Sequence, residues 1–289
     1  MNEALTVVRN YIALIISAIV ALFGCANLNM GGVSNAEPGT VRVMSFNIRC
    51  GEFEDRGEIV PRLIADYHPD SLGLQECTYD WFSYLRLFLH KDYGFVGVGR
   101  DTGDRSVKCG EMSLVLYRKD KYNLVDSGTF WLSETPDEVS LGWDGACNRI
   151  CTWVVLENKE TGEKYAHVNT HLDHVGPLAR QNGVELVKEK ALSYDIPTVV
   201  TGDFNFSKGS ELYNSLVTGG LTDTQDMAEY TMTGKTYHGY NGGSEGEPID
   251  FICVNSQITD VKTYKIIRDM YDGKYTSDHY PIFSDMVIG

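Results

Sequence analysis

The sequence predicts a sheet-rich α/β domain, and two patterns of apolar residues predict it. The first is a set of short, continuous apolar runs, such as residues 112–116 and 198–200, which are typical of strands covered on both faces. The second is a helical spacing of apolar side chains over residues 78–90 and 177–193. No internal repeat or second composition is visible, so one catalytic domain over residues 40–289 is expected.

The two helical runs each present one apolar stripe. Their members are Trp81, Leu85 and Phe88 in the first run, and Val184, Val187 and Ala191 in the second. Stripes of this kind are contacts with a core rather than a cofactor-binding motif. The sequence therefore predicts two helices that pack on a sheet.

Polar residues stand at the ends of six apolar runs. Four runs end in a polar group, and two runs are preceded by one. The first set comprises Asn47, Glu76, His171, and Asp203 with Asn205; the second comprises Asp250, and Asp278 with His279. If the runs are strands, the ends of the first four strands and the starts of the other two meet at a single edge of a mixed sheet, because antiparallel neighbours run in opposite directions. Four carboxylates, two amides and two imidazoles are therefore expected in one place.

This collection of side chains suits metal-dependent cleavage of a phosphate ester. The reaction needs a cation at the phosphate oxygens, an orienting group for the attacking water, and donors that face the developing charge. Hard cations such as Mg²⁺ select carboxylate and amide oxygens. Glu76 is the first choice as metal ligand, with Asn47 and Asp278 beside it. Asn205, like Asn47, could bind metal or phosphate oxygen without adding negative charge.

The remaining members of the set suit proton transfer and phosphate binding. Asp203 lies on a tight turn and could orient or deprotonate the attacking water. His171 and His279 would donate to the phosphate, each with its tautomer fixed by a carboxylate partner. Asp250 and Asp278 are the candidate partners, and the sequence does not say which imidazole each one meets.

Six segments that carry these residues resemble, in order, the successive motifs of the endonuclease/exonuclease/phosphatase superfamily. They are Phe46-Asn47, Leu74-Gln75-Glu76, Asn169-Thr170-His171-Leu172-Asp173, Gly202-Asp203-Phe204-Asn205, Ile249-Asp250-Phe251-Ile252 and Ser277-Asp278-His279-Tyr280-Pro281. Each motif alone is a weak signal, but six in family order over residues 41–289 are specific. The stretch 128–136 and the pair Asn148-Arg149 resemble an exported bacterial branch of the family.

The resemblance implies a four-layer α/β/β/α sandwich, like that of deoxyribonuclease I, in which helices flank two mixed β-sheets. It also implies Mg²⁺ or Mn²⁺ at the site and hydrolysis of a phosphate ester. The catalytic residues that it assigns are His171, Asp203, Asn205, Asp250 and His279.

Taken singly, several of these residues have a plainer interpretation. Asn47 could be a turn former, His171 a structural histidine, and Asp250 a strand-edge charge that discourages aggregation. Arg149 begins an apolar run, where an arginine that binds the substrate phosphate would be useful, although a strand-edge arginine fits equally well. The occurrence of all the motif residues together favours the site.

Other residues near the motifs can be interpreted in two ways. Trp143 and the glycine-rich residues 237–243 are expected to border the pocket, with ordinary packed loops as the alternative. Asp173 and His174 either extend the site or cap the helix that follows. His238 matches no motif and is expected on the surface or as a hydrogen-bonded interior group.

The N-terminal 25 residues are expected to be a signal peptide. The apolar stretch from Tyr11 to Phe23 is shorter than the ~20 residues of a transmembrane helix and suits a signal-peptide core. The residues that follow resemble a bacterial lipobox, in which Cys25 is lipidated. Ordinary cleavage after Ala36 and an uncleaved anchor are the alternatives, and each exports the catalytic domain. The expected location is the bacterial membrane or cell surface, otherwise the medium.

Residues 26–39 are rich in small and polar side chains, as expected of a linker. Apart from Cys25, six cysteines remain, and six allow 15 pairings. Cys77 and Cys253 adjoin site motifs inside core-like runs, where buried free thiols are common. A full set of disulfides is therefore not expected.

Net charge limits the substrate. The chain carries a formal charge of −15 and has no cluster of Lys and Arg that could follow a polyanionic duplex. A long nucleic acid is disfavoured, and a small or lipid-linked phosphate ester fits better; a monomer is expected. The alternatives are an extracellular nuclease for DNA or RNA and a surface binding protein that has kept the fold without catalysis.

Overall fold

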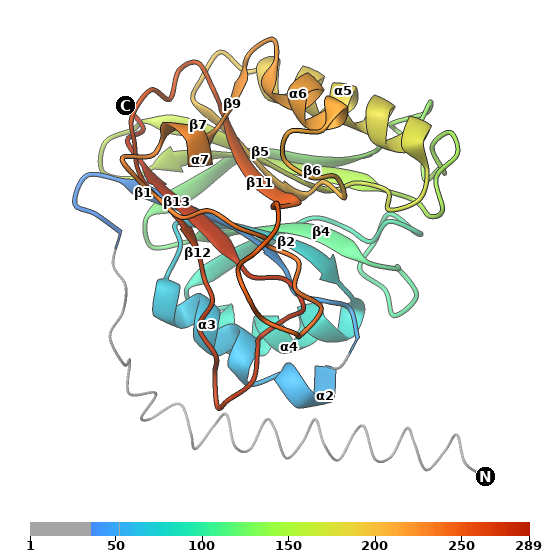
Figure 1. Cartoon of the computed structure of the whole chain (residues 1–289), viewed down its shortest axis with the longest axis horizontal. Helices are drawn as coiled ribbons and strands as arrows, with labels where there is room; N and C mark the ends of the chain where they lie inside the picture. The colour runs from blue at the N-terminus through green and yellow to red at the C-terminus, as the bar shows by residue number, and fades with distance from the viewer. Residues whose placement is uncertain (1–35, 52) are drawn as a thin grey trace.

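Two β-sheets packed face to face form the centre of the molecule, and helices cover both outer faces (Figure 1). The computed structural model describes residues 36–51 and 53–289. The expected signal peptide, the lipidated Cys25 and most of the linker lie outside these residues. No helix in the described part of the chain combines the length and the apolar character needed to cross a membrane.

The first sheet has seven strands of mixed direction. Their order is β10 (Tyr230–Thr231), β12 (Val261–Ile266), β13 (Ile282–Met286), β1 (Val41–Asn47), β2 (Ser71–Cys77), β4 (Met112–Arg118) and β3 (Tyr93–Val96). Strands β1 and β2 are parallel, and β13 and β4 flank them in the opposite direction. The ends of β1 and β2 therefore lie beside the segment that enters β13.

The second sheet has six strands and is also mixed. Their order is β5 (Tyr122–Trp131), β6 (Ile150–Asn158), β7 (Lys164–His171), β8 (Thr198–Asp203), β11 (Asp250–Asn255) and β9 (Leu221–Asp223). Strands β7 and β8 are parallel, whereas β11 runs antiparallel to β8. This arrangement brings the ends of β7 and β8 to the start of β11.

The helices form the two outer layers, as Figure 1 shows. Next to the first sheet lie α2 (Phe53–Arg56), α3 (Ile59–Tyr67) and α4 (Tyr79–Leu89); over the second lie α5 (Pro177–Leu192) and α6 (Glu211–Val217), while the short α7 (Thr224–Met227) joins β9 to β10. The four-layer α/β/β/α prediction is confirmed, and so are both predicted helices. α4 begins where the side chain of Thr78 accepts a hydrogen bond from the backbone N–H of Trp81.

Apolar side chains fill the three interfaces between the four layers of helices and sheets, and they form three apolar layers. One lies between the first sheet and its helices and includes Trp81 and Leu85; another lies between the second sheet and its helices and includes Val184 and Val187. The third lies between the sheets. The predicted stripes are thus core contacts, and the six cysteines of the described chain are all free thiols.

The layer between the sheets also contains a hydrogen-bonded polar network. The ring of His167, which is fully buried, lies 2.9 Å from Ser71 Oγ and 2.8 Å from Thr201 Oγ1. Asn169 accepts from Thr201 at 3.0 Å and from the amide of Gln75 at 2.7 Å. Because Gln75 and Asn169 lie on the strands that end in Glu76 and His171, this network ties the two sheets together directly behind those side chains.

Candidate active site

The predicted site residues lie together, but they come from two sheets rather than from one sheet edge. Asn47 and Glu76 belong to the first sheet, whereas His171, Asp203 and Asp250 belong to the second. The expectation that these residues share one edge of a single sheet was wrong. The strand ends that carry them belong to two sheets and face each other across the sandwich. Inside the second sheet, Asp203 is the register partner of both His171 on β7 and Asp250 on β11.

Asn47 is the bridge between the two sheets. Its amide nitrogen donates to Glu76 Oε1 at 3.0 Å and to Asp203 Oδ2 at 2.9 Å, and its Oδ1 accepts from the backbone N–H of Arg49 at 3.0 Å. The side chain is buried and its polar atoms are all used. Asn47 therefore fixes the relative position of the two carboxylates and is not a mere turn former.

Glu76 sits at an irregularity of β2, where the pairing with β4 shifts register. Its backbone adopts a φ of +60°, which is unusual for a residue other than glycine. Burial alone raises the pKa of its carboxyl, but hydrogen bonds from the Cys50 backbone and the Asn47 amide outweigh burial and lower the pKa. Glu76 is therefore an ionised, half-buried carboxylate held in one orientation.

His279 lies between two carboxylates of the second sheet. Its Nδ1 is 2.9 Å from Asp250 Oδ2, and its Nε2 is 3.7 Å from Asp203 Oδ2. Burial lowers the pKa of this ring, but Asp250 and Asp203 outweigh burial and raise it to about 10. Two carboxylates directly opposite on neighbouring strands repel each other, and the imidazolium offsets that repulsion. Burial and Asp250 together raise the pKa of Asp203 to about 6, although His279 and Asn47 act in the opposite direction.

His171 and Asn205 form a second pair beside Asp203. The amide nitrogen of Asn205 donates to Leu172 O at 2.9 Å and lies 3.1 Å from His171 Nε2. Nε2 is therefore the acceptor, and the ring proton is on Nδ1. Burial first, then Arg149 and His279, hold the pKa of His171 well below its usual range, so the ring is neutral. Its Nδ1 has no hydrogen-bond partner among the described residues.

Arg149 is almost fully buried, with 6% of its surface exposed. Its Nε is 3.6 Å from Asp173 Oδ2, and its Nη2 is 3.0 Å from His174 Nδ1. Asp173 also accepts hydrogen bonds from Val175, Gly176 and Ala146, which fixes its carboxylate. Asp173 and His174 thus extend the site by holding Arg149, and they do not cap α5.

A small cavity lies in front of His171 and Arg149. Glu76, Arg100, Glu111 and Ser113 complete its polar lining. Within the described chain, Nε and Nη1 of Arg149 and Nε of Arg100 have no hydrogen-bond partner. Buried donors are rarely left unpaired, so an acceptor group such as water or phosphate oxygen is expected among them.

Sequence reasoning missed Arg100 and Glu111, which form a two-fold ion pair with N–O distances of 2.8 and 2.9 Å. Glu111 directly precedes the apolar run that becomes β4, the same position that Asp250 has before β11. The presence of a polar residue directly before an apolar run could therefore have identified Glu111. Arg100 carries no such signal, because it lies in a turn rather than next to an apolar run.

The structure settles the carboxylate partners of the two imidazoles. Asp250 is the partner of His279, and Asp203, with its Oδ2 3.4 Å from Nε2, is the carboxylate beside His171. The expectation that Asp278 serves one of the rings was wrong. Asp278 Oδ2 instead lies 3.7 Å from Arg49 Nη1 at the rim, and Ser277 donates to its other oxygen at 3.3 Å.

The side chains present fit a hard divalent cation. Glu76 and Asp278 offer carboxylate oxygens, and the ionised state of Glu76 leaves lone pairs that its two hydrogen bonds do not use. Donor atoms of Asp203, Asp250 and His279 also lie within 4.8 Å of one another. The 2.9 Å contact between Asp250 and His279 is a hydrogen bond, so a proton rather than a metal joins these groups.

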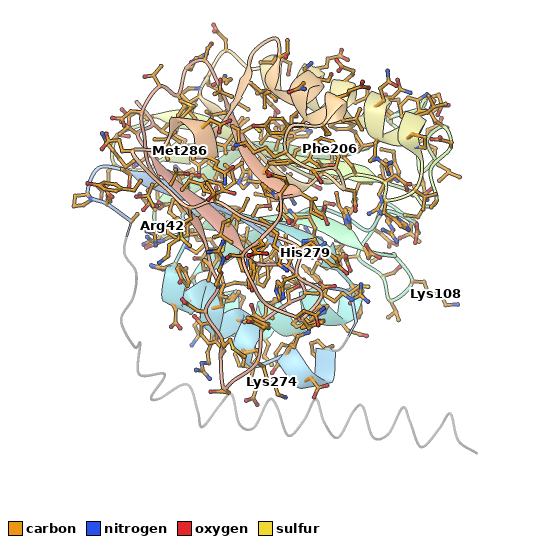
Figure 2. All side chains as sticks on the ribbon, in the orientation of Figure 1. Arg42, Lys108, Phe206, Lys274, His279 and Met286 are labelled. Atoms are coloured by element: carbon orange, nitrogen blue, oxygen red, sulfur yellow. The ribbon has the colours of Figure 1, made fainter. Side chains whose placement is uncertain are left out.

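Residues 237–243 border the site, as predicted. Tyr237 pairs with His279 through a β-bridge, and the backbone N–H groups of His238 and Gly239 donate to Asp278 O at 2.9 and 3.1 Å. His238 is an interior residue, one of the two predicted alternatives, and its ring stacks on Tyr280. In Figure 2, His279 lies between Phe206, on the side of α5 and α6, and Lys274, on the side of α2.

Known proteins resemble this chain over most of its length. The model of the Endonuclease/Exonuclease/phosphatase family matches residues 44–279. A family protein from Bacteroides vulgatus has a solved structure that is 37% identical with a TM-score of 0.79, and the match covers 86% of this chain and 99% of that one. A mannosyl-6-phosphatase of Bacteroides thetaiotaomicron is 32% identical with a TM-score of 0.80, covering 86% and 100%.

A curated relative is more distant. The CCR4-Not complex 3'-5'-exoribonuclease subunit Ccr4 of Emericella nidulans is 25% identical over 273 residues. The match covers 68% of this chain and 40% of that protein. Similar chains thus include both a sugar phosphatase and a ribonuclease.

Proposed function

The chain belongs to the endonuclease/exonuclease/phosphatase family, and from this premise we propose that it is a divalent-metal-dependent phosphatase of small phosphate esters, with phosphorylated sugars as the substrate class. Family members are hydrolases that act on phosphate esters. The observation that carries the proposal is the group of unpaired buried donors on Arg149 and His171, two residues that line one cavity together with Glu76.

Asp203 is the group that orients and deprotonates the attacking water. Its pKa of about 6 leaves it ionised near neutral pH but still basic enough to accept a proton. The amide of Asn47 and the backbone N–H of Asn205 donate to its two oxygens, which fixes their direction. His279, held by Asp250, supplies a positive charge next to the reacting phosphate.

The phosphate itself is bound by donors that are already in place. Arg149 and His171 line the same cavity, and Nε and Nη1 of Arg149 and Nδ1–H of His171 have no hydrogen-bond partner in the described chain. Donors fixed before the reaction stabilise developing charge without reorganisation, and removal of one typically costs about 10²- to 10³-fold in rate. Asp173 and His174 keep the guanidinium of Arg149 in this position.

Mg²⁺ or Mn²⁺ would be held by Glu76, with Asp278 and the amide oxygens of Asn47 and Asn205 as further candidates. A bound cation would neutralise charge on the phosphate oxygens and so make the phosphorus atom easier for water to attack. Glu76 prepares for this role through its lowered pKa, since a ligand that is already ionised need not lose a proton when the metal arrives.

Small substrates fit this protein better than polymers do. The net charge of −15 repels a polyanion, and the similar mannosyl-6-phosphatase at 32% identity supports a sugar phosphate. The similarity to an exoribonuclease is weaker and covers a smaller part of that relative. Ribonuclease activity is therefore the outcome that competes with the proposal.

The test is phosphate release by the full-length chain from mannose 6-phosphate, a phosphodiester, a phospholipid and single-stranded RNA, with Mg²⁺, Mn²⁺ or chelator. We expect metal-dependent turnover of the sugar phosphate, lowered about 10²-fold or more in Asp203→Ala. The matched control is Asp272→Ala, which removes a carboxylate that is 66% exposed. Turnover of RNA alone, or full activity in Asp203→Ala, contradicts the proposal.

We also propose that the enzyme is exported and anchored through Cys25. The support is the sequence of the N-terminal 25 residues, which lie outside the described part of the chain. Incorporation of labelled palmitate in a bacterial host tests the anchor. Labelling of the unaltered protein that disappears in Cys25→Ser supports it, and equal labelling of both contradicts it.

A further inference from the structure

Tyr237 places an exposed aromatic ring against the reacting centre. Its ring centroid is 5.0 Å from that of His279, with an angle of 57° between the planes, and half of the residue is exposed. The backbone bridge to His279 holds it there. A group attached to a phosphate beside His279 would therefore meet this ring.

The loop that carries Tyr237 is fixed before any substrate arrives. His238 N–H and Gly239 N–H donate to Asp278 O, and Tyr280 N–H donates to Thr236 O at 2.8 Å. Below the loop, the buried ring of His238 stacks on Tyr280 with centroids 3.9 Å apart. A rigid aromatic surface binds a ligand ring with little loss of conformational entropy.

Tyr240, in the same loop as Tyr237, and Arg49 adopt a backbone conformation that side chains disfavour. Tyr240 has a φ of +62°, and Arg49 a φ of +59°. For a residue with a Cβ this region costs roughly 1–2 kcal/mol, which glycine avoids. Arg49 Nη1 lies 3.7 Å from Asp278 Oδ2, and its guanidinium also interacts electrostatically with Glu76 and Tyr240. Strain of this kind accumulates where a side chain is needed for function.

We propose that Tyr237, Tyr240 and Arg49 form a subsite for the sugar ring of the phosphate ester, a proposal that rests on the function proposed above. A pyranose has an apolar C–H face and a rim of hydroxyls. The flat, half-exposed ring of Tyr237 suits the apolar face. The guanidinium of Arg49 and the phenol of Tyr240 supply donors for the hydroxyls.

The test compares kcat/KM for mannose 6-phosphate, methyl phosphate and a nucleoside 5′-monophosphate in the full-length protein with saturating Mg²⁺ or Mn²⁺. Tyr237→Ala should lower the ratio of mannose 6-phosphate to methyl phosphate about tenfold, through KM rather than kcat, because a binding contact alone is lost. Tyr237→Phe should keep most of that ratio. Tyr230→Ala is the matched control, since Tyr230 is 70% exposed on β10, the edge strand of the first sheet.

Tyr240→Gly gives an independent readout. Relief of the backbone strain should raise the melting temperature, while the preference for mannose 6-phosphate falls. A merely structural Tyr240 would leave that preference unchanged and overturn its part in the subsite.

Three other results overturn the proposal. Equal losses for the sugar phosphate and methyl phosphate in Tyr237→Ala would mean that Tyr237 only supports His279. An equal loss for the nucleotide would mean that the surface accepts any ring. Turnover of none of the three substrates by the unaltered chain would instead refute the proposed function, and the subsite with it.

Discussion

Replacement of Asp250 by asparagine tests whether the charge on the carboxylate, and not only its hydrogen bond, keeps His279 ready for catalysis. The substitution preserves the size of the side chain and removes the negative charge that lies 2.9 Å from His279 Nδ1. Both residues are buried, so solvent screens their interaction little. Asp203 remains at 3.7 Å from the other ring nitrogen and keeps part of the positive charge on the ring.

The size of the effect follows from this geometry. A hydrogen bond between charged groups contributes about 1.5–3 kcal/mol. If that stabilisation is needed in the transition state, its loss lowers kcat about 10- to 200-fold, at 1.36 kcal/mol for each factor of ten. KM should change little, because the proposed phosphate donors on Arg149 and His171 are left in place.

The assay is steady-state hydrolysis of mannose 6-phosphate at pH 7 with saturating metal. Asp272→Asn is the control, since its carboxylate is 66% exposed and pairs only with Arg62 at the surface. Circular dichroism and thermal melting establish that Asp250→Asn is folded. A folded Asp250→Asn enzyme with kcat within about threefold of the unaltered protein would refute the reasoning, since the threshold lies below the lower bound set by one charged hydrogen bond.

Two further outcomes are expected, one at the proposed metal ligand and one at a buried histidine between the sheets. Glu76→Gln should weaken Mn²⁺ binding at least about tenfold, because even residues that only orient metal ligands contribute that much; isothermal titration measures it, and unchanged affinity would remove Glu76 from the metal site. Burial lowers the pKa of His167 to about 3, so the unfolded chain binds one more proton than the folded chain below pH 6.5. Between pH 7 and pH 5, the free energy of unfolding should therefore fall by up to about 1.4 kcal/mol per pH unit more in the unaltered protein than in His167→Gln. Urea unfolding at both pH values measures this difference. An equal fall in the two proteins would contradict the prediction.

The sequence predicts most of the elements and the site residues because these depend on local pattern. Apolar runs ending in Asn47, His171 and Asp203 became strands that end at those residues. The helices at residues 78–90 and 177–193 also follow from local spacing.

The side-chain pairings in the site could not be predicted from the sequence, because they depend on contacts between segments that are distant along the chain. The pairing of Asp250 with Asp203 is set by the antiparallel register of β8 and β11, which are separated along the chain by α6, β9, α7 and β10. The choice of Asp250 over Asp278 as the partner of His279 follows from that register. Asp278 is adjacent to His279 in the chain, yet its side chain turns to Arg49.

Backbone strain explains why this site needs so extensive a scaffold. Of the seven described non-glycine residues with positive φ, four belong to the site or its rim: Arg49, Glu76, Asn205 and Tyr240. At roughly 1–2 kcal/mol for each bulky residue, this strain is comparable to a substantial part of the 5–15 kcal/mol that stabilises a typical domain. The three apolar layers and the network around His167 offset it, so a substitution to glycine at the two rim positions, Arg49 and Tyr240, should tend to stabilise the fold while weakening the site.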